Sequence, residues 1–475
     1  MRYDMRTLIL LSCLLLSLQL HSQEQLGLRL ERYSGVNSLH LNPANYLSSA
    51  LTWDVNLAGV GVYGNTNYGY IRNTTVPEIL SFLPNIDAAV NYNSETQFPP
   101  NTLIVDAYDN GKRKYASLGA IVMGPAIAIK LPSGHSFGLF TNLRAGFSAF
   151  NIPPELSHHV FDRTPFGQEI QIDPLSSSGM VWSEIGLNYA YRITTAAGSL
   201  DLGASVKFLN GYEAFFANSD AQVGITQFPG DTMTIAAPDV SFGFTNSNTS
   251  GEDMRANRNG RGMGLDLGMV LSLEDHGGEP LWKFGLALLD IGRVRFSENA
   301  ERHRVDTDRS FTFWEGEYSS AEEINDAVQL FSSHALENAS ASRIGSEFNI
   351  WLPGALSLQI DRSLGKHLFL NATLLQRLPH RRNTLRRTNL LAISPRFEHR
   401  WFSAMLPLGL YNYRNFQMGA SLRLGFLTLG SDNITPFFNR GDFTGADFYL
   451  ALKVNPFQLG LDLKRKGKDV KCYDF

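Results

Sequence analysis

Two adjacent histidines are the first residues in this sequence whose types and spacing suggest metal or acid–base chemistry. His158 and His159 stand close to Glu155 and Asp162. Adjacent side chains point in different directions, however, and no Cys or Glu-x-x-His spacing supports a metal site. No spacing of serine, histidine and aspartate indicates a catalytic arrangement, and a Gly-rich phosphate loop is missing from the sequence. We therefore expect no catalytic residue, no metal and no cofactor, and we expect that the protein is not an enzyme.

A second group of polar residues falls inside segments where apolar and polar side chains alternate. Their side chains lie on the face opposite the large apolar residues. In a polar or water-filled lumen they can be hydrated or paired, whereas a dry core would make their burial costly. The candidates for a polar lumen are Arg144, Glu184, Asn188, Arg192, Asp201, Lys207, Asp266 and Arg423.

The elements that must position these residues are β-strands. From Gly262 to Glu274 a large apolar residue occupies every second position, and a period of two is a strand signal. Such segments run about ten residues, which matches the length that a tilted strand needs to cross a bilayer. We predict an all-β fold, namely a transmembrane antiparallel β-barrel of about 14 strands with long extracellular loops. The expected strands lie near 52–63, 117–131, 135–148, 181–193, 198–209, 212–226, 231–245, 262–274, 281–296, 344–361, 366–377, 389–402, 414–428 and 446–456.

Composition agrees with a membrane barrel or a large exported all-β protein. Charged residues make up 18% and aromatic residues 11% of the 475 residues, and there are 42 glycines, so the chain is poor in charge for a globular protein. A net charge of −4 without a long basic stripe gives no reason to expect nucleic acid as a partner. No apolar run after the N-terminus is long enough for a spanning helix, so a membrane protein of this sequence must be a barrel.

The first 22 residues have the pattern of a cleaved signal peptide, with two arginines, an apolar run and a polar exit. Cys13 lies inside the apolar run; the alternative, a lipoprotein attachment site, is disfavoured because the run continues beyond it. Cleavage leaves Cys472 as the single cysteine, so no internal disulfide is expected. We expect an exported protein of the bacterial outer membrane, with lipid and lipopolysaccharide as its surroundings.

Asp290 interrupts the strand pattern of LALLDIGRVRF and is followed by Arg293 and Arg295. These groups are expected to form an ion pair in the lumen or a girdle at the membrane surface, with a structural role favoured over substrate binding.

The strongest local charge feature is the run RLPHRRNTLRR. Three interpretations are open: a solvated turn between two strands, a site for anionic lipopolysaccharide if the run faces outside, and a site for a periplasmic partner if it faces inside. Its arginines are Arg377, Arg381, Arg382, Arg386 and Arg387.

The stretch 297–343 is expected to be a long loop that carries a short amphipathic helix. A capping box from Ser320 to Glu323 precedes Ile324, Val328 and Phe331, which share one helical face. The helix is expected to rest on the barrel rim, with docking onto a partner as the alternative.

Three blocks of sequence carry a resemblance to a known group of proteins. They are NSLHLNPANYL near the N-terminus, GMGLDLGMVLSLED with LWKFGLALLDIGRVRF in the middle, and PRFEHRWFSAMLPLGLYNYRNFQMGASLRLGFLTLGSDN near the end. The chain resembles an uncharacterised family of outer-membrane barrels from gliding, type IX-secreting Gram-negative bacteria. That family is similar to the FadL-like long-chain fatty-acid transporters and to the PorV-like secretion barrels.

The resemblance implies an N-terminal segment that folds inward as a hatch, with Asn42, Pro43 and Ala44 in it. The local residues agree, since asparagine readily forms a side-chain turn and a residue before proline is extended; the plain alternative is a turn before the first strand. The implied organisation is a signal peptide over 1–22, a hatch over 23–50, a barrel over 51–457 and a polar, basic periplasmic tail over 458–475.

Three functional hypotheses remain, because a fold does not fix a function. The favoured one is a FadL-like channel for small hydrophobic compounds, which an apolar internal pocket and a mobile hatch would support. The alternative is an interaction or assembly role with secretion-apparatus proteins of type IX secretion or gliding, which a polar lumen and a fixed hatch would support. The third is a soluble exported all-β protein.

Overall fold

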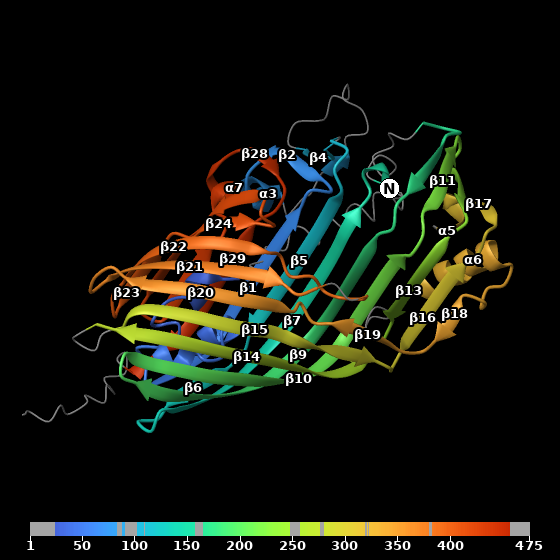
Figure 1. Ribbon diagram of the computed structural model, residues 1–475. Helices are drawn as coiled ribbons and strands as arrows, with labels where there is room; N and C mark the ends of the chain where they lie inside the picture. Colours follow the sequence, from blue (N-terminus) through green and yellow to red (C-terminus); the bar gives the residue numbers. More distant parts are fainter. Residues whose placement is uncertain are drawn as a thin grey trace, which may run out of the picture.

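The closed β-sheet is the main feature of the computed structural model (Figure 1), which describes residues 24–82, 88–90, 102–108, 110–156, 165–247, 257–275, 280–318, 321, 323–379 and 382–456. Its first strand, β1 (Trp53–Thr66), pairs on one side with β5 and β6 and on the other with the last strand, β29 (Asp447–Val454). The sheet therefore closes into an antiparallel barrel, and the prediction of 14 strands is confirmed.

Several of the spanning strands are interrupted, so two shorter strands share one crossing. In β5 and β6 the interruption falls at Gly124 and Pro125, and in β23 and β24 it falls at Leu406 and Pro407, because proline cannot donate to the ladder. Around the barrel from β1 to β29 follow β5 (Lys114–Met123) with β6 (Ala126–Lys130), β7 (His135–Ile152), β9 (Ser176–Thr195), β10 (Gly198–Ser219), β14 (Gly260–Glu274), β15 (Pro280–Phe296), β19 (Phe348–Trp351) with β20 (Ala355–Ser363), β21 (Leu368–Arg377), β22 (Leu390–Glu398), β23 (Phe402–Met405) with β24 (Leu408–Tyr411), β25 (Asn415–Met418) with β26 (Ala420–Leu424), and β27 (Leu427–Ser431).

The outer surface of the barrel carries a belt of exposed apolar side chains. On β14, Met263 is 58% exposed and Leu267 44%, whereas the alternating Asp266 is 1% exposed. Neighbouring strands repeat the pattern, with Ile185, Leu187 and others outward. A contiguous apolar belt around a closed sheet is the surface that a transmembrane barrel presents to lipid. The predicted direction of the apolar face is therefore confirmed.

The two ends of the barrel differ in the length of their connections. At one end β9 and β10 are joined by a two-residue turn, and β26 and β27 by another at Gly425, whose positive φ of 55° favours glycine. At the other end long segments connect the strands, as between β15 and β19. Short turns are typical of the periplasmic end and long loops of the extracellular end.

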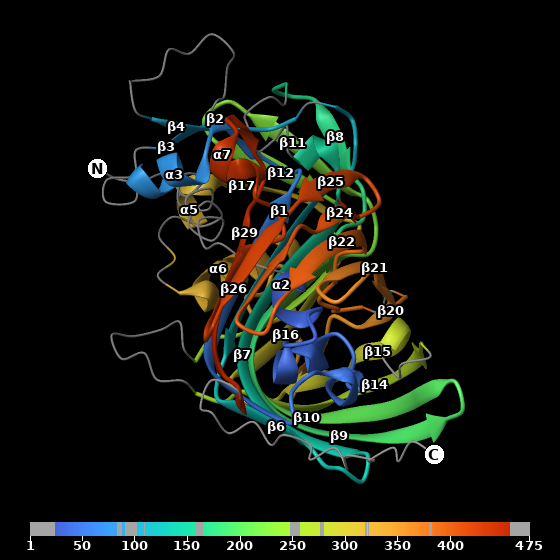
Figure 2. The same ribbon diagram turned by 90° about the vertical axis from the view of Figure 1, so that its left-hand side faces the viewer.

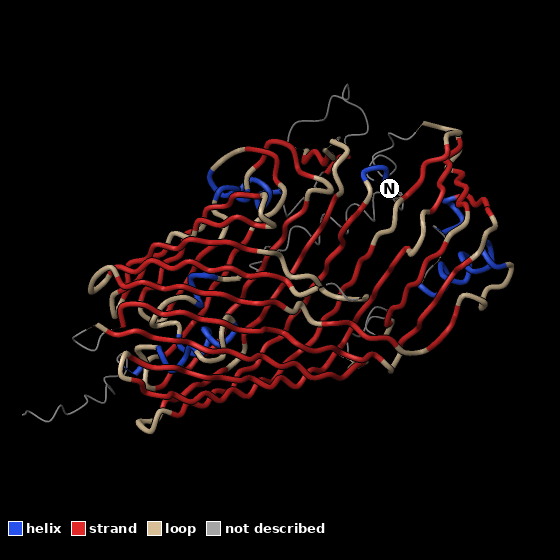
Figure 3. The backbone as a smooth tube through the Cα atoms, in the orientation of Figure 1, coloured by secondary structure: helices blue, strands red, loops and turns tan. Residues whose placement is uncertain are grey.

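Inside the wall lies the segment 24–50, which we call the hatch (Figures 2 and 3). It is built from short helical turns rather than strands, and its apolar side chains are buried against the wall in three clusters. Tyr46 and Leu41 are fully buried there. One part of the hydrophobic core is therefore the contact between hatch and barrel, and another part is a cluster around Trp182 and Phe296 that contains no hatch residue. The turns are α2 (Leu26–Arg29), η1 (Gly35–His40) and η2 (Asn45–Ser48).

The long-loop end carries additional strands and helices outside the spanning wall. β13 (Asp239–Thr245), β16 (Ala300–Asp306) and β18 (Arg343–Gly345) extend the wall from β10. None of the described helices is long and apolar enough to span a membrane. Two small sheets also lie at this end. The first consists of β17 (Ser310–Trp314), β12 (Thr232–Ala236), β11 (Val223–Phe228) and β8 (Glu169–Ile172), and the second of β28 (Gly441–Phe443), β2 (Tyr70–Thr74), β4 (Leu103–Asp106) and β3 (Ala88–Val90). The helices here are α3 (Val76–Phe82), α5 (Glu315–Tyr318), α6 (Ile324–Leu336) and α7 (Thr435–Phe438).

Four of the predicted strands are wrong. The segments 198–209 and 212–226 were expected as separate strands, but β10 continues through Gly211, because β9 pairs with it on both sides of a bulge. The expected strand 231–245 is split between β12, in a small sheet, and β13. The expected strand 414–428 runs across the turn that separates β26 from β27. The strand signals were local, whereas pairing partners decide where a strand ends.

The predicted helix in the loop 297–343 is present as α6, but its cap differs. The capping box pairs Glu323 with Asp326, and Ser320 lies outside the described residues. Phe331 packs edge-on against Phe311, with ring centroids 5.7 Å apart, so the helix rests on the small sheet at the long-loop end. The expected signal peptide, the tail and the two histidines also lie outside the described residues.

Candidate functional site in the barrel lumen

The Asn-Pro-Ala turn of the hatch fits a recess in the barrel wall. Asn42 is fully buried; its Oδ1 accepts the N–H of Ala44 at 3.0 Å and its Nδ2 donates to the carbonyl of Met269 at 3.0 Å. The recess exists because β10 and β14 have glycines where they face the turn. A Cβ on Gly203 would lie 2.6 Å from the backbone of Pro43, and one on Gly268 would lie 2.2 Å from Asn42 Oδ1. Either contact is closer than a real Cβ atom comes to its neighbours, so a side chain at Gly203 or Gly268 would have to displace the turn.

Carboxylates on the wall accept the backbone N–H groups of the hatch. Asp54 Oδ2 accepts from Val36 at 2.7 Å. Because the hatch has little regular structure, its backbone donors would otherwise be unsatisfied in the lumen. Two further pairs of this kind join Glu398 to the N–H of Arg32 at 3.2 Å and Asp432 to the N–H of Leu26 at 3.2 Å.

Lysines on the wall complement these carboxylates by donating to hatch carbonyls. Lys130 donates to Ser49 at 2.8 Å, and Lys283 donates to Ser48 at 3.1 Å. Lys453 donates to the carbonyls of Tyr33, at 2.9 Å, and of Ser34. The wall therefore holds the hatch by its backbone, through groups that water could replace if the hatch moved.

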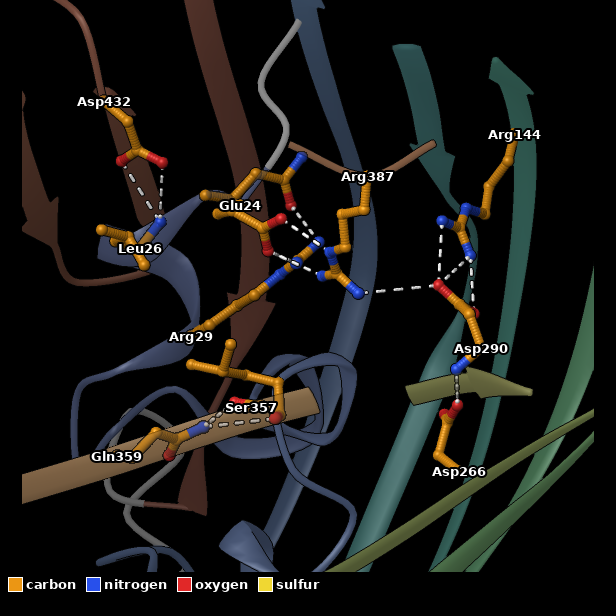
Figure 4. Close-up of polar contacts among 12 residues, drawn as sticks. Glu24, Leu26, Arg29, Arg144, Asp266, Asp290, Ser357, Gln359, Arg387 and Asp432 are labelled. Carbon is orange, nitrogen blue, oxygen red and sulfur yellow. Dashed lines mark hydrogen bonds and ion pairs between the residues drawn. The ribbon is translucent and has the colours of Figure 1, made fainter. Parts of the chain in front are cut away.

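A buried group of charged side chains, which we call the central cluster, joins the hatch to the wall and to one long loop (Figure 4). Asp290 is its hub: Lys207 Nζ lies 2.6 Å from Oδ1, Arg144 Nη1 lies 3.2 Å from Oδ1, and Arg387 Nη1 lies 3.7 Å from Oδ2. Buried charges of this kind are tolerated only when they are paired and hydrogen-bonded. The cluster consists of Glu24, Arg29, Arg144, Glu184, Lys207, Asp266, Asp290 and Arg387.

A backbone irregularity in β15 places Asp290 in this position. Asp290 has a φ of 54°, where the pairing of β14 with β15 shifts register. The bulge turns the carboxylate into the lumen, which is a common use of such irregularities. Its backbone N–H donates to Asp266 Oδ1 at 2.7 Å, so the neighbouring strand supports the bulge.

The hatch contributes Glu24 to the central cluster as a two-point partner of Arg387. The Nε and Nη2 atoms of Arg387 lie 2.7 and 2.6 Å from the two carboxylate oxygens (Figure 4). Paired hydrogen bonds of this geometry are among the strongest that side chains form. The loop between β21 and β22 therefore reaches into the barrel and holds the start of the hatch.

Two cavities lie against the hatch at different depths in the lumen. The upper cavity, of about 90 Å³, lies towards the long-loop end beneath Leu385. The lower cavity, of about 40 Å³, lies towards the short turns beside Lys283 and Gln359. Arg29 of the hatch lines both cavities. Burial lowers the pKa of Arg29 to about 10, so its guanidinium stays charged at neutral pH.

The family of this chain can be stated once this architecture is known. Residues 43–432 match a family described as a family of unknown function (DUF5723). The chain belongs to this family. None of the curated proteins matches it.

Among solved structures, the family member described here is similar in fold to several outer-membrane proteins. The toluene transporter TodX of Pseudomonas putida is 10% identical, with a TM-score of 0.39 over 92% of this chain and 96% of that chain. A deltaS2 mutant of the TodX monoaromatic hydrocarbon channel is 10% identical, with a TM-score of 0.41 over 89% and 95%. A FadL homologue of Pseudomonas aeruginosa is 8% identical, with a TM-score of 0.27 over 92% and 99%. Such distant likeness is no guide to a ligand, so the lumen must be interpreted from its own geometry.

The residues singled out for a polar lumen fall into three places in this family member. Arg144, Glu184, Lys207 and Asp266 lie in the central cluster. Asn188 Nδ2 donates to the carbonyl of Pro43 at 3.0 Å. The remaining three lie nearer the short turns, where Arg192 pairs with Asp201 at 2.6 Å and Arg423 pairs with Glu31 of the hatch at 2.9 Å.

The basic run between β21 and β22 divides between surface and lumen. Arg382 pairs with Asp220 on the surface, and Arg377 and Arg386 lie over the ring of Phe150. Arg387 is 6% exposed, so the reading as a solvated turn is wrong at this position, because the central cluster draws its guanidinium inside. Arg381 lies outside the described residues.

Several residues that build the site carried no signal in the sequence. Glu24, Arg29 and Glu31 belong to a short polar stretch after the predicted signal peptide, and only the inward fold brings them to their partners. Asp290 was expected to pair with Arg293 or Arg295. In the structure Arg293 lies over Trp351, and Arg295 pairs with Glu347 on the surface. Asp290 thus forms an ion pair in the lumen, but with Arg144, Lys207 and Arg387 and not with Arg293 or Arg295.

Replacing Asp290 with asparagine is expected to weaken the folded barrel more than any other single change in the central cluster. The change removes the carboxylate that three cations share, and unpaired buried charge costs about 3–5 kcal/mol. We expect the temperature of the heat-induced gel shift of the purified protein to fall clearly.

The matched control for this prediction is Glu184→Gln, because Glu184 pairs with Arg144 at 3.5 Å and with no other cation among the described residues. Its shift temperature should stay closer to that of the wild type. Equal temperatures for both variants would contradict the role of Asp290 as hub.

Proposed function

We propose that this protein is a gated outer-membrane channel for small, partly hydrophobic molecules, with the hatch as its closure. The observation that carries the proposal is the pair of lumen cavities with Arg29 of the hatch in the wall of both. Empty space in the lumen thereby adjoins the hatch at two depths. Movement of one short segment would join the two parts.

The surroundings follow from the outer surface. The apolar belt lies in lipid, the long-loop end faces the lipopolysaccharide layer outside, and the short turns face the periplasm. Export through a cleaved signal peptide at residues 1–22 belongs to this proposal, as does the polar, basic tail on the periplasmic side.

The lining of the upper cavity supports a wider substrate class than pure hydrocarbons. Leu118, Phe147, Trp182 and Leu385 form an apolar part. Arginines and Lys207 form a charged part. A molecule with one apolar and one polar end would satisfy both, whereas a wholly apolar molecule would leave the charges without a partner.

The hold on the hatch is compatible with opening. The hatch is held by hydrogen bonds from wall lysines and carboxylates to its backbone, in addition to apolar burial. Water admitted to the lumen can replace each of these hydrogen bonds. Opening therefore exchanges one set of polar partners for another, in the manner of a two-state element.

Conductance across a planar bilayer tests the proposal, with Arg29→Ala as the decisive variant. Truncation of Arg29 removes the hatch side chain that lines both cavities. We expect the variant to conduct ions at a higher level than the wild type, because the two cavities then meet. Arg295→Ala, on the surface, is the matched control and should behave as the wild type does. Indistinguishable traces for the wild type and Arg29→Ala would overturn the proposal.

An interaction role with secretion-apparatus proteins is the second candidate, favoured by the polar lumen and by the sheets and α6 at the long-loop end. Under this role the hatch is a permanent plug. Arg29→Ala would then stay silent in the bilayer, and loss of the α6 loop, not of hatch contacts, would abolish the phenotype in cells.

A further inference from the structure

The upper cavity has a lining whose charge is one-sided. Its charged lining residues are four arginines and one lysine, with Asp290 as the single carboxylate. The other carboxylates of the central cluster, Glu24, Glu184 and Asp266, stand behind these cations and not on the cavity surface. A small polar cavity with cations at its surface favours an anion, and fixed guanidinium groups favour a planar one.

Arg29 gives a second, independent indication. It is 5% exposed, and its Nε is among the buried nitrogen atoms that have no hydrogen-bond partner in the described part of the chain. Its Nη2 donates to Gln25, and its Nη1 lies 3.7 Å from Glu24. An unsatisfied guanidinium N–H beside a cavity is costly unless something else accepts it.

The hatch itself indicates which anion the site accepts. Glu24 is a carboxylate, and through both oxygens it binds Arg387, which lines the upper cavity (Figure 4). Because Glu24 belongs to a segment that the proposed channel must move, its carboxylate is a built-in ligand that a free carboxylate could replace.

We propose that the upper cavity binds a short-chain carboxylate at Arg29 and Arg387, and that Glu24 competes with it for Arg387. The size of the cavity limits the ligand. At about 90 Å³ the space corresponds to roughly six to nine water positions, which accommodates a chain of a few carbons and excludes a long acyl chain. The inference deepens the proposed channel by naming the class of molecule its cavity recognises. It rests on that proposal only for the link between binding and opening.

The test is a calorimetric titration of sodium butanoate into the full-length protein in mild detergent, at constant ionic strength in chloride. We expect saturable binding by the wild type. Glu24→Gln removes the competing charge and should tighten binding about tenfold, whereas Arg29→Gln removes a donor and should weaken it about tenfold. The matched control for Glu24→Gln is Glu347→Gln, which removes an arginine-paired carboxylate from the surface and should leave the affinity unchanged.

Opposite shifts from two neighbouring residues distinguish binding from damage, because a misfolded lumen would weaken binding in both variants. Inorganic phosphate forms the second arm of the titration and should bind more weakly than butanoate. Equal affinities in wild type, Glu24→Gln and Arg29→Gln would overturn the site, and phosphate binding as tight as butanoate would overturn the carboxylate as its ligand. Binding without any bilayer conductance would keep the site and overturn the channel, and conductance without binding would do the reverse.

Discussion

Alanine at both Gly203 and Gly268 is expected to displace the hatch and make the barrel permeable. Each added methyl would enter the space of the Asn-Pro-Ala turn, 2.6 Å from the backbone of Pro43 and 2.2 Å from Asn42 Oδ1. Forcing a group into a packed site costs about 1–3 kcal/mol, and each 1.4 kcal/mol is about tenfold in the population of the open state. Together we expect a rise of at least about tenfold in the release of a small dye from proteoliposomes.

The matched control for this double variant is Gly119→Ala. Gly119 also lines the lumen, but a Cβ there would meet only the backbone oxygen of Ala145, at 3.8 Å. This variant should leak no faster than the wild type. A double variant that stays as tight as Gly119→Ala would contradict the view that the recess holds the hatch shut.

Replacing Lys453 with methionine is expected to free the middle of the hatch. Lys453 Nζ lies 3.2 Å from Asp54 Oδ2 and also holds the carbonyls of Tyr33 and Ser34. Its loss leaves the buried Asp54 unpaired at a cost of about 3–5 kcal/mol. A cysteine placed at Ser48, with Cys472 changed to serine, should then react with a maleimide about a hundredfold faster or more.

A control variant and a rescuing variant accompany Lys453→Met. Lys366→Met changes an exposed lysine near the same end of the barrel and should leave the reaction rate unaltered. Adding Asp54→Asn to Lys453→Met removes the orphaned charge and should recover part of the protection. Fast labelling in the Lys366→Met control, or none in the Lys453→Met variant, would show that the lysine does not hold the hatch.

The barrel could be predicted because strand alternation is a local property of the sequence. Asp266 and Val270 alternate with Met263, Leu267 and Met269, and the chain needs no distant partner to sort these faces. The strand ends were less predictable. Whether 212–219 continues β10 depends on its pairing with β9, and the nearby bulge after Gly211 gives no clear local signal.

Of the residues in the site, those on the barrel wall could be predicted from the sequence, and their partners could not. Wall residues such as Glu184 and Lys207 are found from their place in the alternation, because a charge opposite a lipid-facing side chain must face the lumen. Their partners come from the hatch and from the loop that carries Arg387, and those contacts join residues hundreds of positions apart, as between Glu24 and Arg387. Such pairs depend on the fold as a whole, and no spacing in the sequence encodes them.

The proposed channel depends most on a hatch that moves as a closure. A cysteine pair at positions 42 and 268 tests it directly. Asn42→Cys removes the Oδ1 atom that a Cβ on Gly268 would meet, and that Cβ would lie 3.0 Å from the place of Asn42 Cγ, where the partner sulfur of a disulfide would lie. With Cys472 changed to serine and Lys453 changed to methionine in the same chain, bilayer conductance is recorded before and after reduction. We predict that the oxidised protein is silent and that reduction brings openings, because the hatch freed by Lys453→Met can then move. Equal conductance in the oxidised and reduced states would contradict a moving hatch.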